Sequence, residues 1–252
     1  MMCQRFAQFG FGLVASLTCL PALLAQPYLP EAPIRTASAD GAPFHTRTAS
    51  SQSALQIVPI DSLPVSIREK VRKVMVQPTL VTHAPKEEFA AAPQVYEWLL
   101  DHPDRATMAW QRLGVQCTPI QDKGQGKFSW SDGEGSEVVW STIYQTADVR
   151  VWYSEGKVKP GALLPTIPVR AVVVLRHNYP ANTTNITRIR HQVDVFATAD
   201  SRAANLVARL LGPTADHLAE QGAEQMLTFF GVLAEHLGRH PEQTEKLLSP
   251  RR

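Results

Sequence analysis

Cysteine is scarce in this sequence, and its few occurrences are unevenly placed. Of three cysteines in 252 residues, Cys3 and Cys19 lie near the N-terminus and only Cys117 lies in the rest of the chain. One thiol cannot close an internal disulfide, so the apolar core must supply the stability. A lone cysteine beside strand-forming residues is typical of a small buried hydrophobe, and no neighbouring base marks Cys117 as a nucleophile.

The sequence also lacks the short motifs that announce a reaction. There is no G-x-S-x-G elbow of a serine hydrolase. Gly124-Gln125-Gly126 has neither the third glycine nor the Lys-Ser/Thr pair of a phosphate loop. The eight histidines are scattered without the spacing of metal ligands. We therefore assign no catalytic residue, no metal and no cofactor from the sequence.

Strong charge of one sign is missing as well. The formal net charge is +2 and the isoelectric point is near 8.5. Nucleic-acid binding usually leaves a larger basic footprint, so we exclude it as a function class. The hydrophobic content of 44% is sufficient for a core.

A long transmembrane run is absent, but the N-terminus has the pattern of a secretory signal. Arg5 supplies a positive charge, Phe9 to Leu20 form an apolar stretch, and Leu23-Leu24-Ala25 ends in a small residue. We predict a signal peptide over residues 1–26 and export to the periplasm or the exterior. The alternative is an anchor formed by an uncleaved N-terminal segment. Residues 27–54, rich in Pro, Ala, Ser and Thr, are predicted to be a disordered linker.

The dominant feature that is present is a long amphipathic run, Ser201 to Leu237, which predicts a helix with one apolar stripe. Gly212-Pro213 is expected to divide it, because proline disrupts a helix interior. A second, shorter helix is predicted over residues 65–76, with a basic face that includes Arg68 and Lys73. Membrane contact is conceivable at two places, the predicted signal peptide and this basic helix.

Between these helices the pattern predicts a helical pair followed by a meander of about six strands. Thr79–His83 is an expected strand, and helices are expected from Pro93 and from Arg105, the second ending at Gly114. Period-two alternation and turn signals then mark the meander. Its strands are Val115–Ile120, Phe128–Trp130, Val138–Tyr144, Val149–Tyr153, Val169–His177 and Thr187–Thr198.

In this order of elements, the chain resembles the START-like (SRPBCC, Bet v 1-like) helix-grip superfamily. Ala84–Phe89, Val95–Pro103 and Trp110 look like that family's opening. The resemblance implies an α+β fold in which a curved antiparallel sheet wraps around a long C-terminal helix. We place this domain at residues 55–240 and a flexible tail at residues 241–252.

The resemblance further implies an apolar cavity between sheet and helix. Members bind lipids, sterols, polyketides or other hydrophobic small molecules, and some are cyclases or hydrolases. Alternation along the two longest strands puts His177 and His191 on the inner face, with Arg188, Arg190, Gln192 and Asp194 marking the solvent side. The predicted cavity lining is His177, His191, Val173, Leu175, Val193, Gly222, Met226 and Phe230.

These features predict an exported, non-enzymatic module that binds a hydrophobic small molecule or lipid. One alternative is a cyclase- or hydrolase-type enzyme that uses His191 or His177 as an acid–base in the same cavity. Another is a structural or interaction domain whose interior is filled by its own side chains. The two histidines are either polar anchors for a ligand or buried groups satisfied by backbone or water.

Overall fold

The structure is a computed structural model that describes residues 56–159, 165–180, 187–199 and 214–249. The predicted signal peptide and linker lie outside the described residues. So does the part of the amphipathic run that precedes residue 214.

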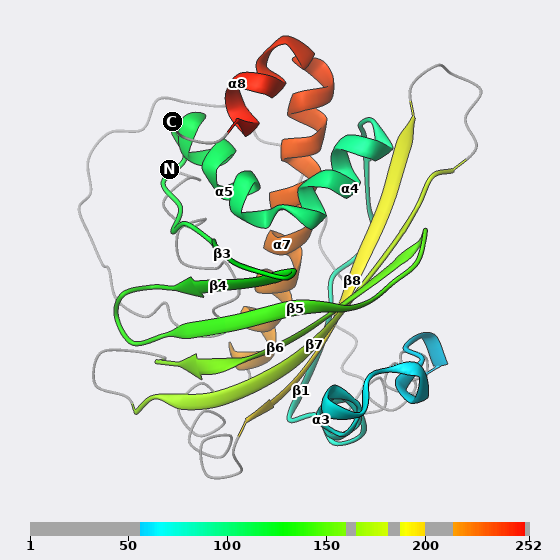
Figure 1. Cartoon of the computed structure of the whole chain (residues 1–252), viewed down its shortest axis with the longest axis vertical. Helices are drawn as coiled ribbons and strands as arrows, with labels where there is room; N and C mark the ends of the chain where they lie inside the picture. The colour runs from blue at the N-terminus through cyan, green and yellow to red at the C-terminus, as the bar shows by residue number, and fades with distance from the viewer. Residues whose placement is uncertain (1–55, 160–164, 181–186, 200–213, 250–252) are drawn as a thin grey trace.

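An eight-stranded antiparallel sheet forms the centre of the fold (Figure 1). Its strands are β1 (Leu80–His83), β2 (Glu87–Ala90), β3 (Gln121–Gly124), β4 (Lys127–Ser131), β5 (Glu137–Gln145), β6 (Val149–Val158), β7 (Ile167–Asn178) and β8 (Arg188–Ala199). The strand order is β1-β8-β7-β6-β5-β4-β3, and β2 also pairs with β8. Five of the six strands predicted for the meander are confirmed, as β4 to β8.

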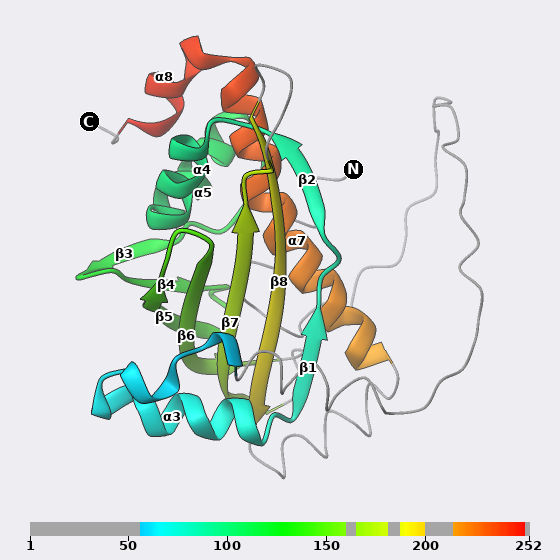
Figure 2. The ribbon, with the colours of Figure 1, turned by 90° about the vertical axis from the view of Figure 1, so that its right-hand side faces the viewer.

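Helices cover both faces of this sheet, and Figure 2 shows α7 and α3 on opposite sides of it. The helical elements are η1 (Ile60–Ser62), α3 (Val65–Val76), α4 (Pro93–Asp101), α5 (Pro103–Arg112), α7 (Thr214–Arg239), η2 (Pro241–Gln243) and α8 (Thr244–Leu248). The long helix α7 contacts β1, β2 and β8. The predicted α+β fold, a sheet wrapped around a C-terminal helix, is confirmed.

Two separate apolar layers hold the fold together. The inner layer, between the sheet and α7, contains Phe128, Trp130, Trp140, Trp152, Leu227, Leu233 and Leu237. The outer layer joins α3 to the other face of the sheet and contains Val71, Val74, Met75, Val151, Val172 and Phe196. The central strands β6, β7 and β8 are thus buried on both faces. Such strands read as nearly continuous apolar runs rather than as alternating ones.

Helix α3 coincides with the predicted helix, and three of its four basic side chains bind to the protein itself. Lys70 donates to Glu155 at 3.1 Å, Arg72 to Asp61 at 2.9 Å, and Arg68 to the Leu63 carbonyl at 3.0 Å. Among the helices of the described ranges, none is long and apolar enough to cross a membrane.

One predicted strand, Val115–Ile120, is wrong. These residues follow Gly114 and run as an irregular segment back along α5. Side chains of α5 bind their backbone: Gln111 donates to the Cys117 carbonyl at 2.9 Å, and the Ile120 amide donates to Thr107 Oγ1 at 3.3 Å. Because these backbone groups are bound to α5, pairing in the sheet begins only at β3.

Strand β6 is longer than predicted, because Gly156 continues the strand instead of ending it. A Cβ atom at this position would lie 2.1 Å from the Glu137 carbonyl oxygen and 2.7 Å from Val138 Cα on β5. Only glycine allows the two backbones to approach this closely. The expected closing turn at Glu155-Gly156 is therefore a close contact between paired strands.

The flexible tail expected over residues 241–252 is also corrected, because residues 241–248 form η2 and α8. Leu247 is buried against the inner layer. Arg112 of α5 donates from Nη1 to the carbonyls of Lys246, Leu247 and Ser249, each at 2.8 Å. The guanidinium thus satisfies carbonyls at a helix C-terminus that have no partner within the helix.

We expect Arg112→Met to lower the free energy of unfolding by about 1–2 kcal/mol, because three carbonyls lose a charged donor. Urea denaturation measures this loss, and hydrogen exchange should rise in residues 246–249. The control is Arg239→Met, which removes a solvent-exposed i,i+4 pair with Glu235 and should cost only about 0.5 kcal/mol. Equal losses in the two variants would contradict an anchoring role for Arg112.

Candidate functional site

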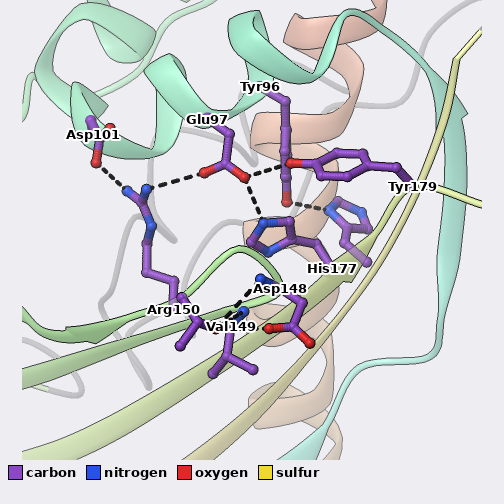
Figure 3. A network of polar contacts seen from close by, with 10 residues as sticks. Tyr96, Glu97, Asp101, Asp148, Val149, Arg150, His177 and Tyr179 are labelled. Atoms are coloured by element: carbon purple, nitrogen blue, oxygen red, sulfur yellow. Dashed lines mark hydrogen bonds and ion pairs between the residues drawn. The ribbon is translucent and has the colours of Figure 1, made fainter.

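A cluster of polar side chains lies on the inner face of the sheet where α4 faces it (Figure 3). Arg150 comes from β6 and shares its inner face with the buried Trp152. Glu97 and Asp101 come from α4, where a spacing of four residues puts both carboxylates on one side of the helix. Proline at the first position of α4, with its fixed φ, favours the start of this helix.

Arg150 is the centre of the cluster, and its side chain is 0% exposed. Its Nη1 donates to Asp101 Oδ1 at 2.6 Å, and its Nη2 donates to Glu97 Oε2 at 3.3 Å. Its Nε has no hydrogen-bond partner among the described residues. A buried guanidinium needs such counter-charges, because the desolvation of an unpaired ion costs several kcal/mol.

His177 binds the other oxygen of the same carboxylate. Its Nε2 lies 2.7 Å from Glu97 Oε1, and the Tyr179 hydroxyl donates to that oxygen at 2.5 Å. Because a carboxylate oxygen only accepts, this contact assigns the proton of the neutral ring to Nε2. His177 Nδ1 is then an acceptor, and it has no partner in the described part of the chain.

A second chain of contacts runs beside the first. The hydroxyl of Tyr96 lies 2.8 Å from His191 Nδ1, and His191 Nε2 lies 3.5 Å from Glu87 Oε2. His191 and His177 are direct partners in the β7–β8 pairing. Gly231 of α7 makes room for this layer, since a Cβ there would lie 3.2 Å from His191 Cε1. The chain leads from half-exposed Glu87 to fully buried Tyr96.

Burial raises the pKa of Tyr96 well above that of a free tyrosine, and the nearby charge of Glu97 adds to this. Burial and the bond to Glu97 raise the pKa of Tyr179 in the same direction, and burial and Glu155 raise that of Tyr153. A folded-state pKa above the unfolded value contributes stability that is complete below the unfolded pKa and is lost as the pH rises.

We therefore expect the free energy of unfolding to fall as the pH rises above about 10, the pKa of unfolded tyrosine. Urea midpoints between pH 8 and 11 measure this dependence. Tyr96→Phe should make the decline shallower, because one of the three phenols no longer titrates. A decline of unchanged steepness in that variant would show that Tyr96 does not contribute.

The structure gathers most of the predicted cavity residues in the inner layer, as expected from strand alternation. The buried ones are His177, His191, Val173, Leu175, Val193 and Phe230. Met226 is partly buried against them, and Gly222 is half-buried with nothing within 4 Å of a Cβ placed there. The buried stripe of α7 runs through Ala223 and Leu227, one residue beyond the predicted Gly222 and Met226. Their role as cavity lining stays a prediction.

Sequence reasoning missed Arg150 and its partners on α4. Two signals pointed to them: the four-residue spacing of Glu97 and Asp101, and the position of Arg150 two residues before Trp152 in a strand. Tyr179 follows the end of β7, outside the segments of regular hydrophobic periodicity, so no sequence pattern indicated its position in the cluster.

The expectation that Asp194 faces solvent is wrong. Asp194 is 6% exposed and binds His83 Nδ1 at 2.5 Å and also the Arg176 guanidinium. The outer layer around α3 covers much of this face, which sequence alternation alone does not reveal. Arg188 and Arg190 are exposed as predicted, and both pair with Glu88.

Within the described ranges, no three His, Cys, Asp or Glu side chains could together hold a metal ion. Cys117 lies beside a depression of about 440 Å³ on the surface next to α5. Burial raises the pKa of its thiol to about 11, so the reactive thiolate is scarce at neutral pH.

No family model and no curated protein matches the sequence. Among solved structures, a conserved protein from Geobacillus kaustophilus is 14% identical with a TM-score of 0.38, covering 60% of this chain and 95% of its own. A norcoclaurine synthase from Thalictrum flavum is 16% identical (TM-score 0.35; 62% and 94% covered). The aromatase/cyclase Zhui from Streptomyces sp. R1128 is 16% identical (TM-score 0.32; 63% and 96% covered).

The fold of the present chain rests on its own strand pairing and helix packing.

Proposed function

We propose that this chain is an exported binding module that holds a small, largely apolar molecule between the inner face of the sheet and α7. The observation that carries the proposal is a pair of nitrogen atoms, Arg150 Nε and His177 Nδ1, that have no hydrogen-bond partner in the described part of the chain. Both side chains are 0% exposed. We call such buried atoms without a partner uncommitted. They belong to an interior that is otherwise lined by aliphatic and aromatic side chains.

Uncommitted buried polar atoms are costly. Each is expected to cost about 1–3 kcal/mol unless another group binds it. Apolar ligand sites commonly contain a few such groups, which orient the ligand. Uncommitted atoms also occur on Thr82, Gln225 and His236. Arg150 and His177 differ from these because both bind the same carboxylate, Glu97, which concentrates them in one cluster.

The position of Gly222 supplies a mutational test of where the ligand sits. A Cβ added at Gly222 meets nothing within 4 Å. If the ligand lies against this part of α7, Gly222→Leu should fill the space and reduce uptake of an apolar probe at least about tenfold. Fluorescence titration with 2-naphthol measures uptake, and Gly222→Ala is the matched control with a small side chain. Uptake that is unchanged in the leucine variant would rule out this placement.

Native mass spectrometry of the full-length chain, expressed in an exporting host and purified without detergent, tests the proposal as a whole. We expect a bound apolar molecule of defined mass, and a protein mass shortened by the loss of residues 1–26. An intact leader would instead favour the alternative of an uncleaved N-terminal anchor. A chain without adduct that also takes up nothing from a lipid extract would support the alternative of an interior filled by its own side chains.

A second candidate function is favoured by the contacts of Tyr96, His191 and Glu87. A buried hydroxyl, an imidazole and a half-exposed carboxylate in sequence can move a proton between the interior and the surface. This arrangement supports an acid–base enzyme that uses the same interior. Conversion of the molecule found by mass spectrometry, lost in His191→Gln while binding persists, would establish the enzyme over the binding module.

A further inference from the structure

We infer that the polar group of the bound molecule is an uncharged hydroxyl, as in an apolar alcohol or phenol. Its oxygen accepts a hydrogen bond from Arg150 Nε and donates one to His177 Nδ1. This inference rests on the proposed function, since it names the chemical class of the molecule that the interior would hold.

The two uncommitted nitrogens have opposite hydrogen-bonding roles. A guanidinium only donates, so Arg150 Nε offers an N–H group. When the His177 ring is uncharged, its contact with Glu97 places the proton on Nε2 and leaves a lone pair at Nδ1. A hydroxyl can accept one bond and donate another at the same oxygen. A carbonyl or ether would leave His177 Nδ1 unpaired, and an ammonium group would leave the Arg150 Nε–H unpaired.

The strand pairing places both nitrogens in one part of the interior. Arg150 of β6 lies opposite Leu175 of β7, and His177 is two residues further along that strand on the same face. Such diagonal neighbours are within reach of long side chains. Glu97 brings the two side chains together, because its two oxygens bind Arg150 Nη2 and His177 Nε2 separately.

The charges around the site favour a neutral group over an acid. Arg150 carries one positive charge and contacts two carboxylates, Glu97 and Asp101, so these three groups sum to −1. A bound carboxylate would enter beside this net negative charge, and water screens the repulsion only in part because Arg150 and His177 themselves are 0% exposed. Fatty acids are therefore expected to bind worse than the corresponding alcohols.

Matched probes on the unmodified full-length chain test the inference. The first set is 2-naphthol, 2-methoxynaphthalene and 2-naphthoate, and the second is 1-dodecanol, dodecane and dodecanoate. Isothermal titration at pH 7 should show the hydroxyl compound binding about tenfold or more tightly than the other members of its set. Equal binding within both sets, or tightest binding of the acids, would overturn the inference while leaving the proposed function intact. No binding of any probe would refute the proposed function itself.

Two variants locate the effect. His177→Leu should bring 2-naphthol down to the affinity of 2-methoxynaphthalene, because the acceptor is lost. His83→Leu is the control, since this histidine pairs with Asp194 on the opposite face of the sheet, and it should keep the preference for the hydroxyl. A preference that survives in His177→Leu would show that the hydroxyl binds elsewhere. If that variant does not fold, the probe sets on the unmodified chain still decide.

Discussion

The double substitution Glu97→Gln and Asp101→Asn is expected to lower the free energy of unfolding by about 3–5 kcal/mol, the cost of leaving a buried ion without its counter-charge. The guanidinium of Arg150 is 0% exposed and binds both carboxylates. With both neutralised, it keeps its full charge, because an arginine does not lose its proton inside a protein. Urea denaturation at pH 7 measures the loss.

The reverse substitution, Arg150→Met, should cost less. The carboxylates of Glu97 and Asp101 are 28% and 48% exposed, so water can solvate them once the arginine is gone. The control is Glu137→Gln, which breaks an exposed ion pair with Lys157 and should cost under about 1 kcal/mol. If Arg150→Met proved more damaging than the double substitution, the burial of the charge would not be the source of the effect.

Replacing Gly156 by alanine is the second large expected effect. The new methyl group would lie 2.1 Å from the carbonyl oxygen of Glu137 and 2.7 Å from Val138 Cα. Both are backbone atoms of the paired strand β5, so no side chain can rotate away and the strands themselves must separate. We expect a loss of about 3 kcal/mol in the free energy of unfolding, at the upper end for overpacking.

Gly222→Ala is the matched control for this substitution. There the added methyl group meets nothing within 4 Å, and alanine favours a helix interior over glycine by about 1 kcal/mol. The two Gly→Ala variants should therefore shift the thermal midpoint in opposite directions. A tolerated Gly156→Ala would mean that β5 and β6 can part at this point without loss of the remaining pairing.

The sequence predicted the architecture well in segments where the apolar residues follow one periodicity, either helical or alternating. Residues 65–76 form the helix that their spacing indicates. Strand β7 begins two residues before and ends one residue after its predicted bounds, and β8 is shifted by one residue toward the C-terminus. His191 points inward, as alternation along β8 requires. The aliphatic residues beside His191 in β8 do not describe its surroundings. Phe89 and Tyr96, from distant segments, pack edge-on to its ring.

The errors arise where a residue's environment is set by a segment far away in the chain. Asp194 alternates like a surface residue, yet Arg176 and His83 enclose it. The short strand β2 lies along β8, although Thr79–His83 was the strand expected in this part of the chain. The candidate site depends on the meeting of α4 with β6 and β7, segments about 50 or more residues apart, which no local pattern specifies.

The burial of β6 on both faces gives Arg150 a role during folding. Its neighbour Val151 faces the outer layer with Val71, Val74 and Met75. A slip of β6 by one residue would exchange the faces of all its side chains. Arg150 would then enter that apolar layer without a carboxylate, and Val151 would replace it beneath Glu97. The charged residue thus penalises the mispaired arrangement, so a single arginine specifies which of two otherwise similar apolar faces of the strand turns inward.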